Sequence, residues 1–331
     1  MPPHRATRAL ALGGLAAAVA GAYVLAEAKA FRLVRHEVPV AAGVPPLTIL
    51  HLSDTHLAAS GGRLIDFLNR LPDILEVTPD LVLATGDLIE NDSGIEPLVA
   101  AFGRLPARLG RFYVLGSHDY YRSSFKGVAG IFRALLKLER TPVTAAENSS
   151  ARLEEGLVSN GWTGVLNRTE LIDDDGVKIR IAGTDDPYLR RHRTDHAERS
   201  EDEALAIALI HAPDIVSEWL LAGFDLVLAG HTHAGQVRMP LAGALVTNCS
   251  LPLELAGGLH RIGRGWLHVS PGLGTSTYSP IRFLARPEAT LLELKPELGR
   301  GGGRVGELAE DAGDEEGDLL SDIDALVAEP L

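Results

Sequence analysis

Eight aspartate and histidine side chains in this sequence stand in five short motifs, and each motif directly follows an apolar, strand-like run. They are Asp54 with His56, Asp87, His118 with Asp119, His211, and His231 with His233. Nearly all of them are residue types that ligate metal ions. Because the ends of strands can deliver side chains into one site, the motifs together predict a metal centre.

The spacing within the motifs fits this chemistry. Asp54 and His56 are two residues apart, as are His231 and His233, so the members of each pair could be aimed at one ion by a strand end or a tight turn. A carboxylate such as Asp87 can bridge two ions about 3.5–4 Å apart, the usual arrangement for phosphoryl transfer. Imidazole and carboxylate ligands together favour zinc, manganese or iron(II) over calcium.

Apolar runs alternate with helix-like periodicity around these motifs. The expected strands cover residues 46–52, 81–84, 111–115, 177–182, 204–210, 225–229, 243–247, 265–269 and 289–294. The expected helices cover residues 64–75, with an interruption at Pro72, and 95–109. This alternation predicts packed sheets with helices outside them, an α/β layered fold. Residues 123–160, with a helical stretch at 131–138, form a long insertion that either shapes substrate access or is a plain surface excursion.

Composition limits the possible classes of protein. The 331 residues are 46% hydrophobic, which is enough for the core of one large domain or two modest ones. A single cysteine, Cys249, excludes an internal disulfide and a thiolate zinc cluster. The formal net charge of −13 argues against nucleic-acid binding through a broad basic face.

The two ends of the chain differ from the rest. Residues 9–26 carry no charge and follow Arg5 and Arg8, which predicts a membrane anchor within residues 1–36, with a cleaved signal peptide as the alternative. Residues 299–331 are rich in glycine, then in Asp and Glu, which predicts a disordered acidic tail. The globular domain is therefore expected over residues 37–298. We expect a single N-terminal span in the cell membrane with this domain on the extracytoplasmic side, or an exported soluble form.

The order of the five motifs resembles that of the calcineurin-like metallophosphoesterase superfamily. Within it, the chain is most similar to the bacterial membrane-associated or exported phosphodiesterases of the YkuE/YaeI type. The local sequences that carry the resemblance are residues 50–56, 230–236, 269–274 and 280–288. It covers roughly residues 47–294 and implies a four-layer α-β-β-α sandwich of two mixed sheets flanked by helices.

The resemblance also implies an activity and roles for the motif residues. The chain would be a metal-dependent phosphoester hydrolase, more specifically a phosphodiesterase, with two divalent ions (manganese, zinc or iron) and a hydroxide between them as the nucleophile. His118 would contact the phosphate or protonate the leaving oxygen, and Asp119 would orient His118. The implied metal ligands are Asp54, His56 and His233 for one ion, Asp87 as the bridge, and Ser117, His211 and His231 for the other.

Ser117 departs from the family pattern, which has an asparagine whose oxygen completes the second metal site. A serine hydroxyl is shorter and a weaker ligand, so three outcomes stay open. Ser117 ligates poorly, water fills the gap, or the loop shifts and makes His118 a ligand. The alternative function is therefore a metal-binding, membrane-associated protein with weak or no catalysis.

The substrate class follows from the motifs less directly. A membrane-associated or exported phosphoesterase could act on lipid-linked, cell-wall or nucleotide-derived phosphoesters, and no nucleic-acid platform is evident. A phosphorylated substrate could be attracted by basic residues near the motifs, although a run of charges is usually a solvated face. The candidates are Arg190, Arg191, Arg193 and Arg282.

Overall fold

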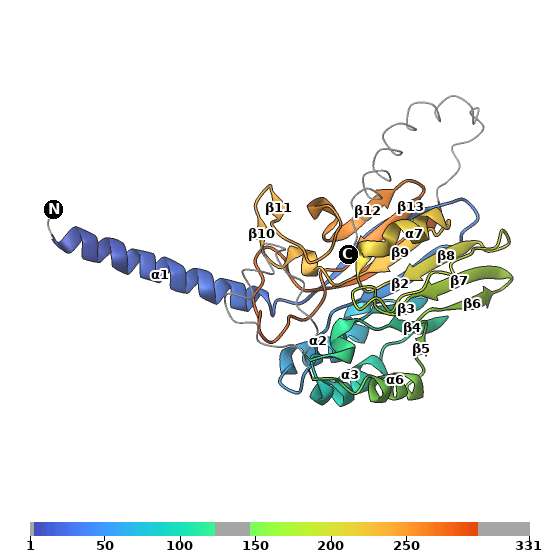
Figure 1. Cartoon of the computed structure of the whole chain (residues 1–331), viewed down its shortest axis with the longest axis horizontal. Helices are drawn as coiled ribbons and strands as arrows, with labels where there is room; N and C mark the ends of the chain where they lie inside the picture. Colours follow the sequence, from blue (N-terminus) through green and yellow to red (C-terminus); the bar gives the residue numbers. More distant parts are fainter. Residues whose placement is uncertain (1–2, 123–145, 297–331) are drawn as a thin grey trace, which may run out of the picture.

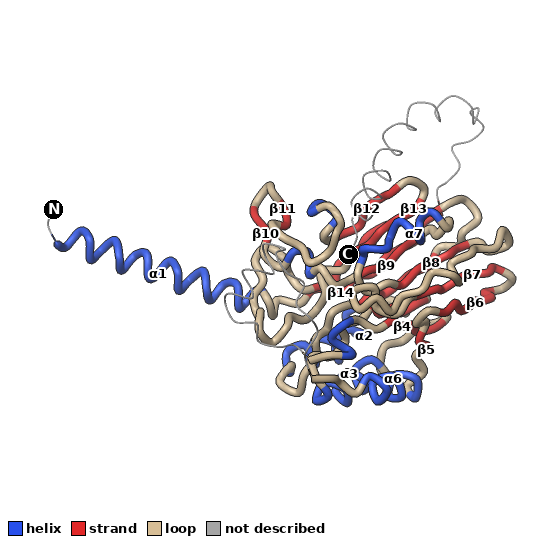
Figure 2. The backbone as a smooth tube through the Cα atoms, viewed as in Figure 1, coloured by secondary structure: helices blue, strands red, loops and turns tan. Residues whose placement is uncertain are grey.

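Two six-stranded mixed sheets stack face to face and carry helices on their outer faces (Figures 1 and 2). The computed structural model describes residues 3–122 and 146–296. The predicted α/β fold, a four-layer sandwich of two mixed sheets flanked by helices, is confirmed. The expected helix at 131–138 and the expected tail at 299–331 lie outside the described residues.

The first sheet has the strand order β1-β14-β2-β3-β4-β5. Strands β2 to β5 run parallel, β14 is antiparallel to β2, and β1 is parallel to β14. The bounds are β1 Arg32–Val40, β2 Leu47–Leu52, β3 Leu81–Thr85, β4 Gly110–Val114, β5 Thr163–Gly164 and β14 Glu288–Pro296.

The second sheet has the order β12-β13-β9-β8-β7-β6. Strands β13, β9, β8 and β7 run parallel, and β12 and β6 are antiparallel edge strands. The bounds are β6 Arg168–Asp174, β7 Val177–Gly183, β8 Leu205–Leu209, β9 Leu226–Ala229, β12 Gly258–Ile262 and β13 Gly265–Val269. A separate hairpin joins β10 (Arg238–Met239) to β11 (Gly243–Ala244).

Apolar residues fill three layers, which is why the central strands read as continuous apolar runs. In β3, Leu81 and Leu83 face the other sheet, whereas Val82 and Ala84 face the helices. The layer outside the first sheet includes side chains of α2 (Gly62–Leu75), α3 (Ile95–Phe102) and α6 (Ser150–Ser159). The layer outside the second sheet includes side chains of α7 (Val216–Leu221).

Helix α2 continues through Pro72, so the expected interruption was wrong. A proline inside a helix costs ~3 kcal/mol. The buried side chains on one face of α2 are Leu64, Phe67, Leu68, Leu71 and Leu75. Each contributes ~1.5–3 kcal/mol on burial, so together they outweigh the cost of the proline.

The N-terminal helix α1 (Pro3–Glu27) projects from the body of the molecule (Figure 1). In residues 3–122 and 146–296, no helix combines the length and the apolar content that crossing a membrane requires. Strand β1 begins at Arg32, inside the segment that we assigned to the anchor, because its nine residues pair in register with β14.

Candidate metal centre

The predicted ligands lie in loops that follow five parallel strands, three in the first sheet and two in the second. Backbone hydrogen bonds join these loops within each sheet: Asp54 N–H donates to Gly86 O, and His56 N–H donates to Asp87 O, both at 2.9 Å. Asp54 and His56 follow β2, Asp87 follows β3, His211 follows β8, and His231 and His233 follow β9. Ser117, His118 and Asp119 lie in the short helix α4 (Ser117–Tyr120), which follows β4.

Backbone strain is concentrated in these loops. A positive φ costs a non-glycine residue ~1–2 kcal/mol, and such strain gathers where a function needs it. Sharp turns, rather than regular strand geometry, therefore aim the ligands inward. The positive values are 47° at Asp54, 40° at His56, 49° at Asp87, 69° at His231 and 49° at His233.

The first group of possible ligands consists of Asp54, His56 and His233, with one ligand atom from each within 4.8 Å of the others. Asp54 Oδ1 lies 3.8 Å from His233 Nε2. The carboxylate of Asp54 is buried and accepts hydrogen bonds from the Ser53 hydroxyl at 2.5 Å and from His231 N–H at 3.1 Å. These bonds hold Asp54 in place without using all of its lone pairs.

The second group consists of Asp87, His211 and His231, which also lie within 4.8 Å of one another. His211 Nδ1 lies 2.7 Å from the carbonyl oxygen of Thr85, which can only accept, so Nδ1 carries the proton. In the neutral ring, Nε2 of His211 is then the unprotonated nitrogen, and it lies 3.3 Å from Asp87 Oδ2 and 3.2 Å from His231 Nδ1. Two acceptors that meet in a buried site fit a cation between them.

Asp87 connects the two groups, because its Oδ2 also lies 3.6 Å from His56 Nε2. Burial by itself would raise the pKa of Asp87, but the nearby imidazoles of His211, His118 and His56 outweigh burial and hold the pKa well below its usual range. For His211, burial would lower the pKa, but the Asp87 carboxylate raises it well above normal. Both shifts indicate that positive charge is favoured between Asp87 and His211.

Bare nitrogen atoms support the same interpretation. His56 Nε2 and His231 Nε2 are buried and have no hydrogen-bond partner among the described residues. Burial lowers the pKa of His231, and it lowers that of His233 well below normal, so these imidazoles stay neutral as metal ligands must. The donor set therefore fits two divalent ions bound by nitrogen and oxygen.

Glu90 is a site residue that we did not predict. Its carboxylate lies 3.1 Å from Nδ1 of His56, so His56 donates through Nδ1 and directs a free Nε2 towards Asp87. A carboxylate behind a ligating histidine is a common arrangement that fixes the tautomer. The only signal in the sequence was its position three residues after Asp87.

His118 and Asp119 differ in their surroundings. His118 lies beside the first group, with Nδ1 4.0 Å from Glu90 and its ring centre 4.7 Å from that of His56. Its backbone N–H donates to Asp87 Oδ1 at 2.7 Å. Burial lowers the pKa of its imidazole, although 28% of the side chain is exposed and can meet a substrate.

We expected the Asp119 carboxylate to orient the His118 imidazole, but its hydrogen-bond partners are backbone N–H groups. Its carboxylate accepts hydrogen bonds from the backbone N–H groups of Leu88 at 2.8 Å, Ile89 at 3.0 Å and Gly116 at 2.9 Å. Asp119 is fully buried, and two of these donors lie in the turn after β3, whereas Gly116 follows β4. Asp119 therefore stabilises the loop that carries Asp87.

The short helix α4 (Ser117–Tyr120) keeps His118 near the first group, with His56 and Glu90. Because the ligand atoms of His56, Glu90 and His118 lie within 4.8 Å of one another, His118 is itself a possible ligand, and the three outcomes left open for Ser117 stay predictions. Two asparagines lie near the ligand loops, and their amides donate to backbone carbonyls: Asn148 to His118 at 2.8 Å and Asn248 to His231 at 3.3 Å.

Arg282 is fully buried, so it is not placed to attract a substrate from solvent. Its Nη2 donates to the carbonyl oxygens of Gly272 at 3.2 Å and Gly274 at 2.7 Å, and it lies 3.2 Å from His233 Nδ1. Arg282 therefore supports the loop that packs against Asp54. Burial lowers its pKa to about 10.

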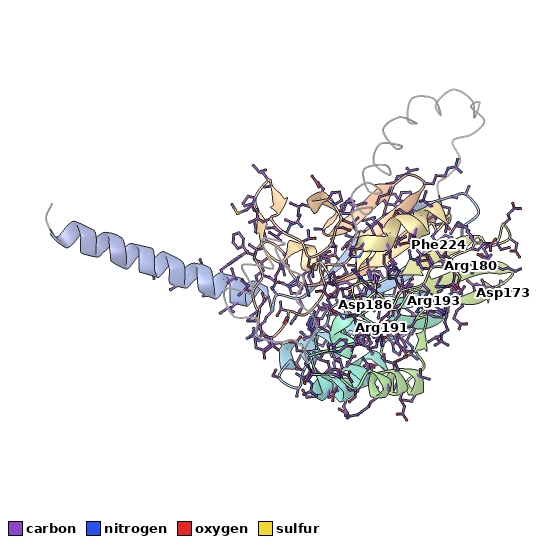
Figure 3. The ribbon with its side chains drawn as sticks, in the orientation of Figure 1. Asp173, Arg180, Asp186, Arg191, Arg193 and Phe224 are labelled. Carbon is purple, nitrogen blue, oxygen red and sulfur yellow. The ribbon has the colours of Figure 1, made fainter. Side chains whose placement is uncertain are left out.

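The exposed arginines lie on a segment beside the site. Figure 3 shows Arg191 and Arg193 near Asp186 towards the middle of the molecule, whereas Asp173 lies at the far end of the second sheet. The guanidinium of Arg191 stacks 4.0 Å from the centre of the Tyr120 ring. Asp186 is buried, which raises its pKa to about 7, and it accepts from the N–H groups of Tyr188 and Leu189.

Comparison with known proteins agrees with this geometry. The family model described as calcineurin-like phosphoesterase matches residues 47–235, more than half of the chain. The chain is 33% identical over 141 residues to the uncharacterized metallophosphoesterase YkuE of Bacillus subtilis, covering 42% of this chain and 49% of that protein. Over 143 residues it is 33% identical to the phosphodiesterase YaeI of Escherichia coli, covering 42% and 50%.

A longer relative extends the match. The bovine (Bos taurus) protein named "Transmembrane protein with metallophosphoesterase domain" is 32% identical over 276 residues, which cover 78% of this chain and 56% of that protein. The chain thus spans about half the length of these three relatives. The resemblance predicted from the order of the five motifs is confirmed, and the chain belongs to the calcineurin-like phosphoesterase family.

Proposed function

We propose that this chain is a metal-dependent phosphodiester hydrolase with a dinuclear site. The observation that carries the proposal is the position of Asp87 Oδ2, 3.6 Å from His56 Nε2 and 3.3 Å from His211 Nε2. Because these two nitrogens belong to different ligand groups, one carboxylate can bridge two ions. The first ion would be held by Asp54, His56 and His233, and the second by His211 and His231.

The residues around the centre suit hydrolysis. Two bound divalent ions would supply an activated water and neutralise charge on the phosphate oxygens. His118 borders the first ligand group with part of its ring exposed, and we assign it the transfer of a proton to the leaving oxygen. Burial lowers the pKa of His118, and the carboxylates of Asp87 and Glu90, the latter 4.0 Å from His118 Nδ1, oppose that effect.

Membrane association is a further part of the proposal. The end of α1 docks on the segment that contains Arg282: the Arg282 N–H donates to Val24 O at 3.1 Å, and the Ala285 N–H donates to Glu27 Oε1 at 2.9 Å. An α1 attached to a membrane would therefore keep the centre close to the lipid surface. This favours a lipid-linked phosphodiester as substrate over a nucleotide-derived one, and the name of the bovine relative agrees with membrane attachment.

Ser117 supports a second candidate, a metal-binding protein with weak catalysis. Ser117→Asn restores the amide oxygen that the family uses, so we expect tighter binding of the second ion and faster hydrolysis. Ser159→Asn, on the exposed side of α6, is the matched control. If Ser117→Asn changes neither metal affinity nor rate, Ser117 does not limit the second site.

The main test is hydrolysis of bis(p-nitrophenyl) phosphate by the purified full chain, stripped of metal and then reloaded with manganese or zinc. We expect activity that depends on added metal and is lost in Asp87→Asn, but is retained in Asp73→Asn, a change at an exposed carboxylate on α2. Absence of activity in the reloaded wild type, or full activity in Asp87→Asn, would reject the proposed function.

A further inference from the structure

A buried chain of polar side chains leads away from the candidate metal centre into the space between the sheets. Its first donor is the Ser53 hydroxyl, which gives its single hydrogen to the Asp54 carboxylate at 2.5 Å. Ser53 Oγ must then accept from the Thr85 hydroxyl at 2.8 Å. With its own hydrogen used, Thr85 must accept from Nε2 of His51, also at 2.8 Å.

The direction of this chain fixes the tautomers of two histidines. His51 is fully buried, which lowers its pKa to about 3, so the ring is neutral and its Nδ1 is an acceptor. Nδ1 of His268 lies 2.8 Å from Nδ1 of His51 and must therefore donate to it. Burial also lowers the pKa of His268 well below normal, so its Nε2 is left with a bare lone pair.

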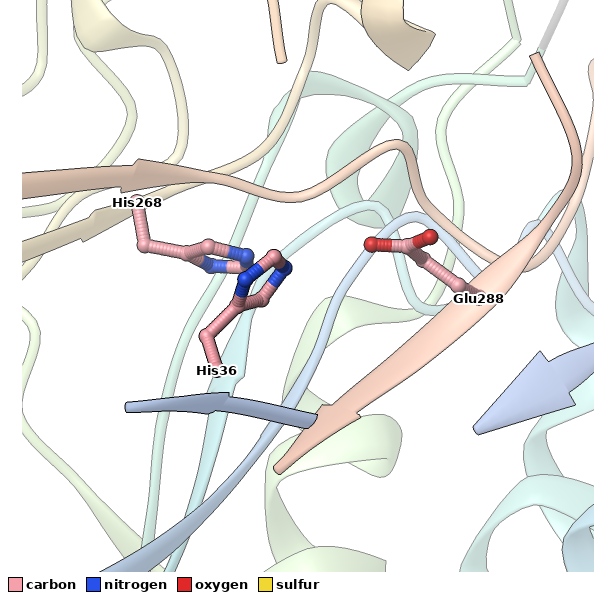
Figure 4. Close-up of side chains that lie close together, drawn as sticks. All are labelled: His36, His268 and Glu288. Carbon is pink, nitrogen blue, oxygen red and sulfur yellow. The ribbon is translucent and has the colours of Figure 1, made fainter. Parts of the chain in front are cut away.

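Nε2 of His268 is buried and has no hydrogen-bond partner among the described residues. An acceptor left in this state costs ~1–3 kcal/mol of stability, and its persistence calls for a ligand. In Figure 4 the end of the His268 ring that carries Nε2 points towards His36 and Glu288. One ligand atom from each of these three residues lies within 4.8 Å of the others.

We propose that His36, His268 and Glu288 form a further site for a divalent cation of the zinc type, separate from the candidate metal centre. Two imidazoles and one carboxylate are a known three-residue zinc set that leaves a fourth position for water. His36 lies on β1 and Glu288 on β14 in the first sheet, whereas His268 lies on β13 in the second. A bound ion would thus link the two sheets.

The Glu288 carboxylate already accepts hydrogen bonds from two residues, and a bound ion would share the carboxylate with them. Its Oε2 accepts from Arg32 at 2.9 Å and 3.2 Å, and its Oε1 accepts from the Thr290 hydroxyl at 3.3 Å. A carboxylate offers about four lone-pair positions, so these bonds leave room for a metal. His36 is half-buried, which gives the ion access from solvent along the outer strand of the first sheet.

Zinc stoichiometry tests the site. Metal-stripped full-length protein is dialysed against zinc, and bound zinc is measured for Asp87→Asn and for the same variant carrying His36→Ala. We expect the second protein to bind one zinc equivalent less, and zinc to raise the melting temperature of Asp87→Asn more than that of the double variant. Both proteins carry Asp87→Asn, which weakens the candidate metal centre equally in the two. The comparison therefore holds even if the chain proves not to be a phosphoesterase.

Two further variants make the result decisive. His36→Thr, whose branched side chain suits a strand, must show the same loss as His36→Ala, which separates loss of a ligand from loss of folding. His192→Thr changes a histidine outside both sites and should leave the zinc content unchanged. Equal zinc binding with and without His36 would overturn the proposal.

Discussion

Nδ1 of His211 lies 2.7 Å from the carbonyl oxygen of Thr85, at the end of β3. This one hydrogen bond decides which ring nitrogen is protonated, because a carbonyl oxygen can only accept. It connects the second sheet, which carries His211, to the first, and it makes Nε2 of His211, which faces Asp87, the nitrogen that is available to a metal ion. The tautomer of a ligand is thus built into the packing of the two sheets.

The first prediction concerns this ligand. His211→Ala should reduce the bound divalent ions of the candidate metal centre from two to one, because Asp54, His56 and His233 stay in place. Hydrolysis should fall about 100-fold or more, since a second ion is worth several kcal/mol to phosphoryl transfer. Metal analysis after dialysis, together with rates on bis(p-nitrophenyl) phosphate, provides the test. Retention of both ions would show that His211 is not a ligand.

The second prediction concerns Glu90, which holds His56 through Nδ1. Glu90→Gln keeps the size of the side chain but removes the charge that favours the Nδ1–H tautomer. We expect metal affinity to fall by about 10–100-fold, the usual effect of changing a residue that supports a ligand. Titration with manganese measures the change. Glu96→Gln, at an exposed position on α3, is the control, and equal affinities in the two variants would contradict the assigned role.

The ligand positions could be predicted from the sequence because residue types that bind metals directly follow apolar, strand-like runs. This pattern is local, so it can be recognised without knowledge of the fold. Glu90 and His268 could not be found in this way, since their importance comes from contacts with residues 34 and 217 positions away in the chain. Strand β1 was assigned to the anchor segment because pairing with β14, more than 250 residues later, leaves no local pattern. Asp119 was paired with its neighbour in sequence, whereas its side chain reaches the turn after β3.

The third prediction concerns the close approach of two loops at Gly230. A Cβ atom here would overlap the hydroxyl of Ser53 and the carboxylate of Asp54. Gly230→Ala should therefore lower the free energy of unfolding by ~1–3 kcal/mol and weaken binding of the first ion, because Asp54 must move. Urea unfolding and metal titration measure the two effects. Gly62→Ala, where a Cβ atom would meet nothing within 4 Å, should have neither.

The fourth prediction uses the buried His51. Its pKa of about 3 lies below the value of 6.5 expected in the unfolded chain, so the unfolded state binds more protons between these two values. Stability that is present above pH 6.5 must therefore be lost as the pH falls towards 3. Between pH 7 and pH 5 the expected loss from this residue alone is about 2 kcal/mol.

Comparison with His51→Gln isolates this contribution, because the variant cannot take up a proton at that position while the other titrating groups remain. Urea unfolding of both metal-free proteins at pH 7 and pH 5 should show the variant losing less stability than the wild type. The variant is expected to be less stable at pH 7, since an amide cannot reproduce both hydrogen bonds of the ring, but the difference should narrow as the pH falls. If the stabilities of the two proteins fall in parallel with pH, the pKa of His51 is not lowered by burial. The argument that His51 is neutral, on which the assigned tautomer of His268 depends, would then fail.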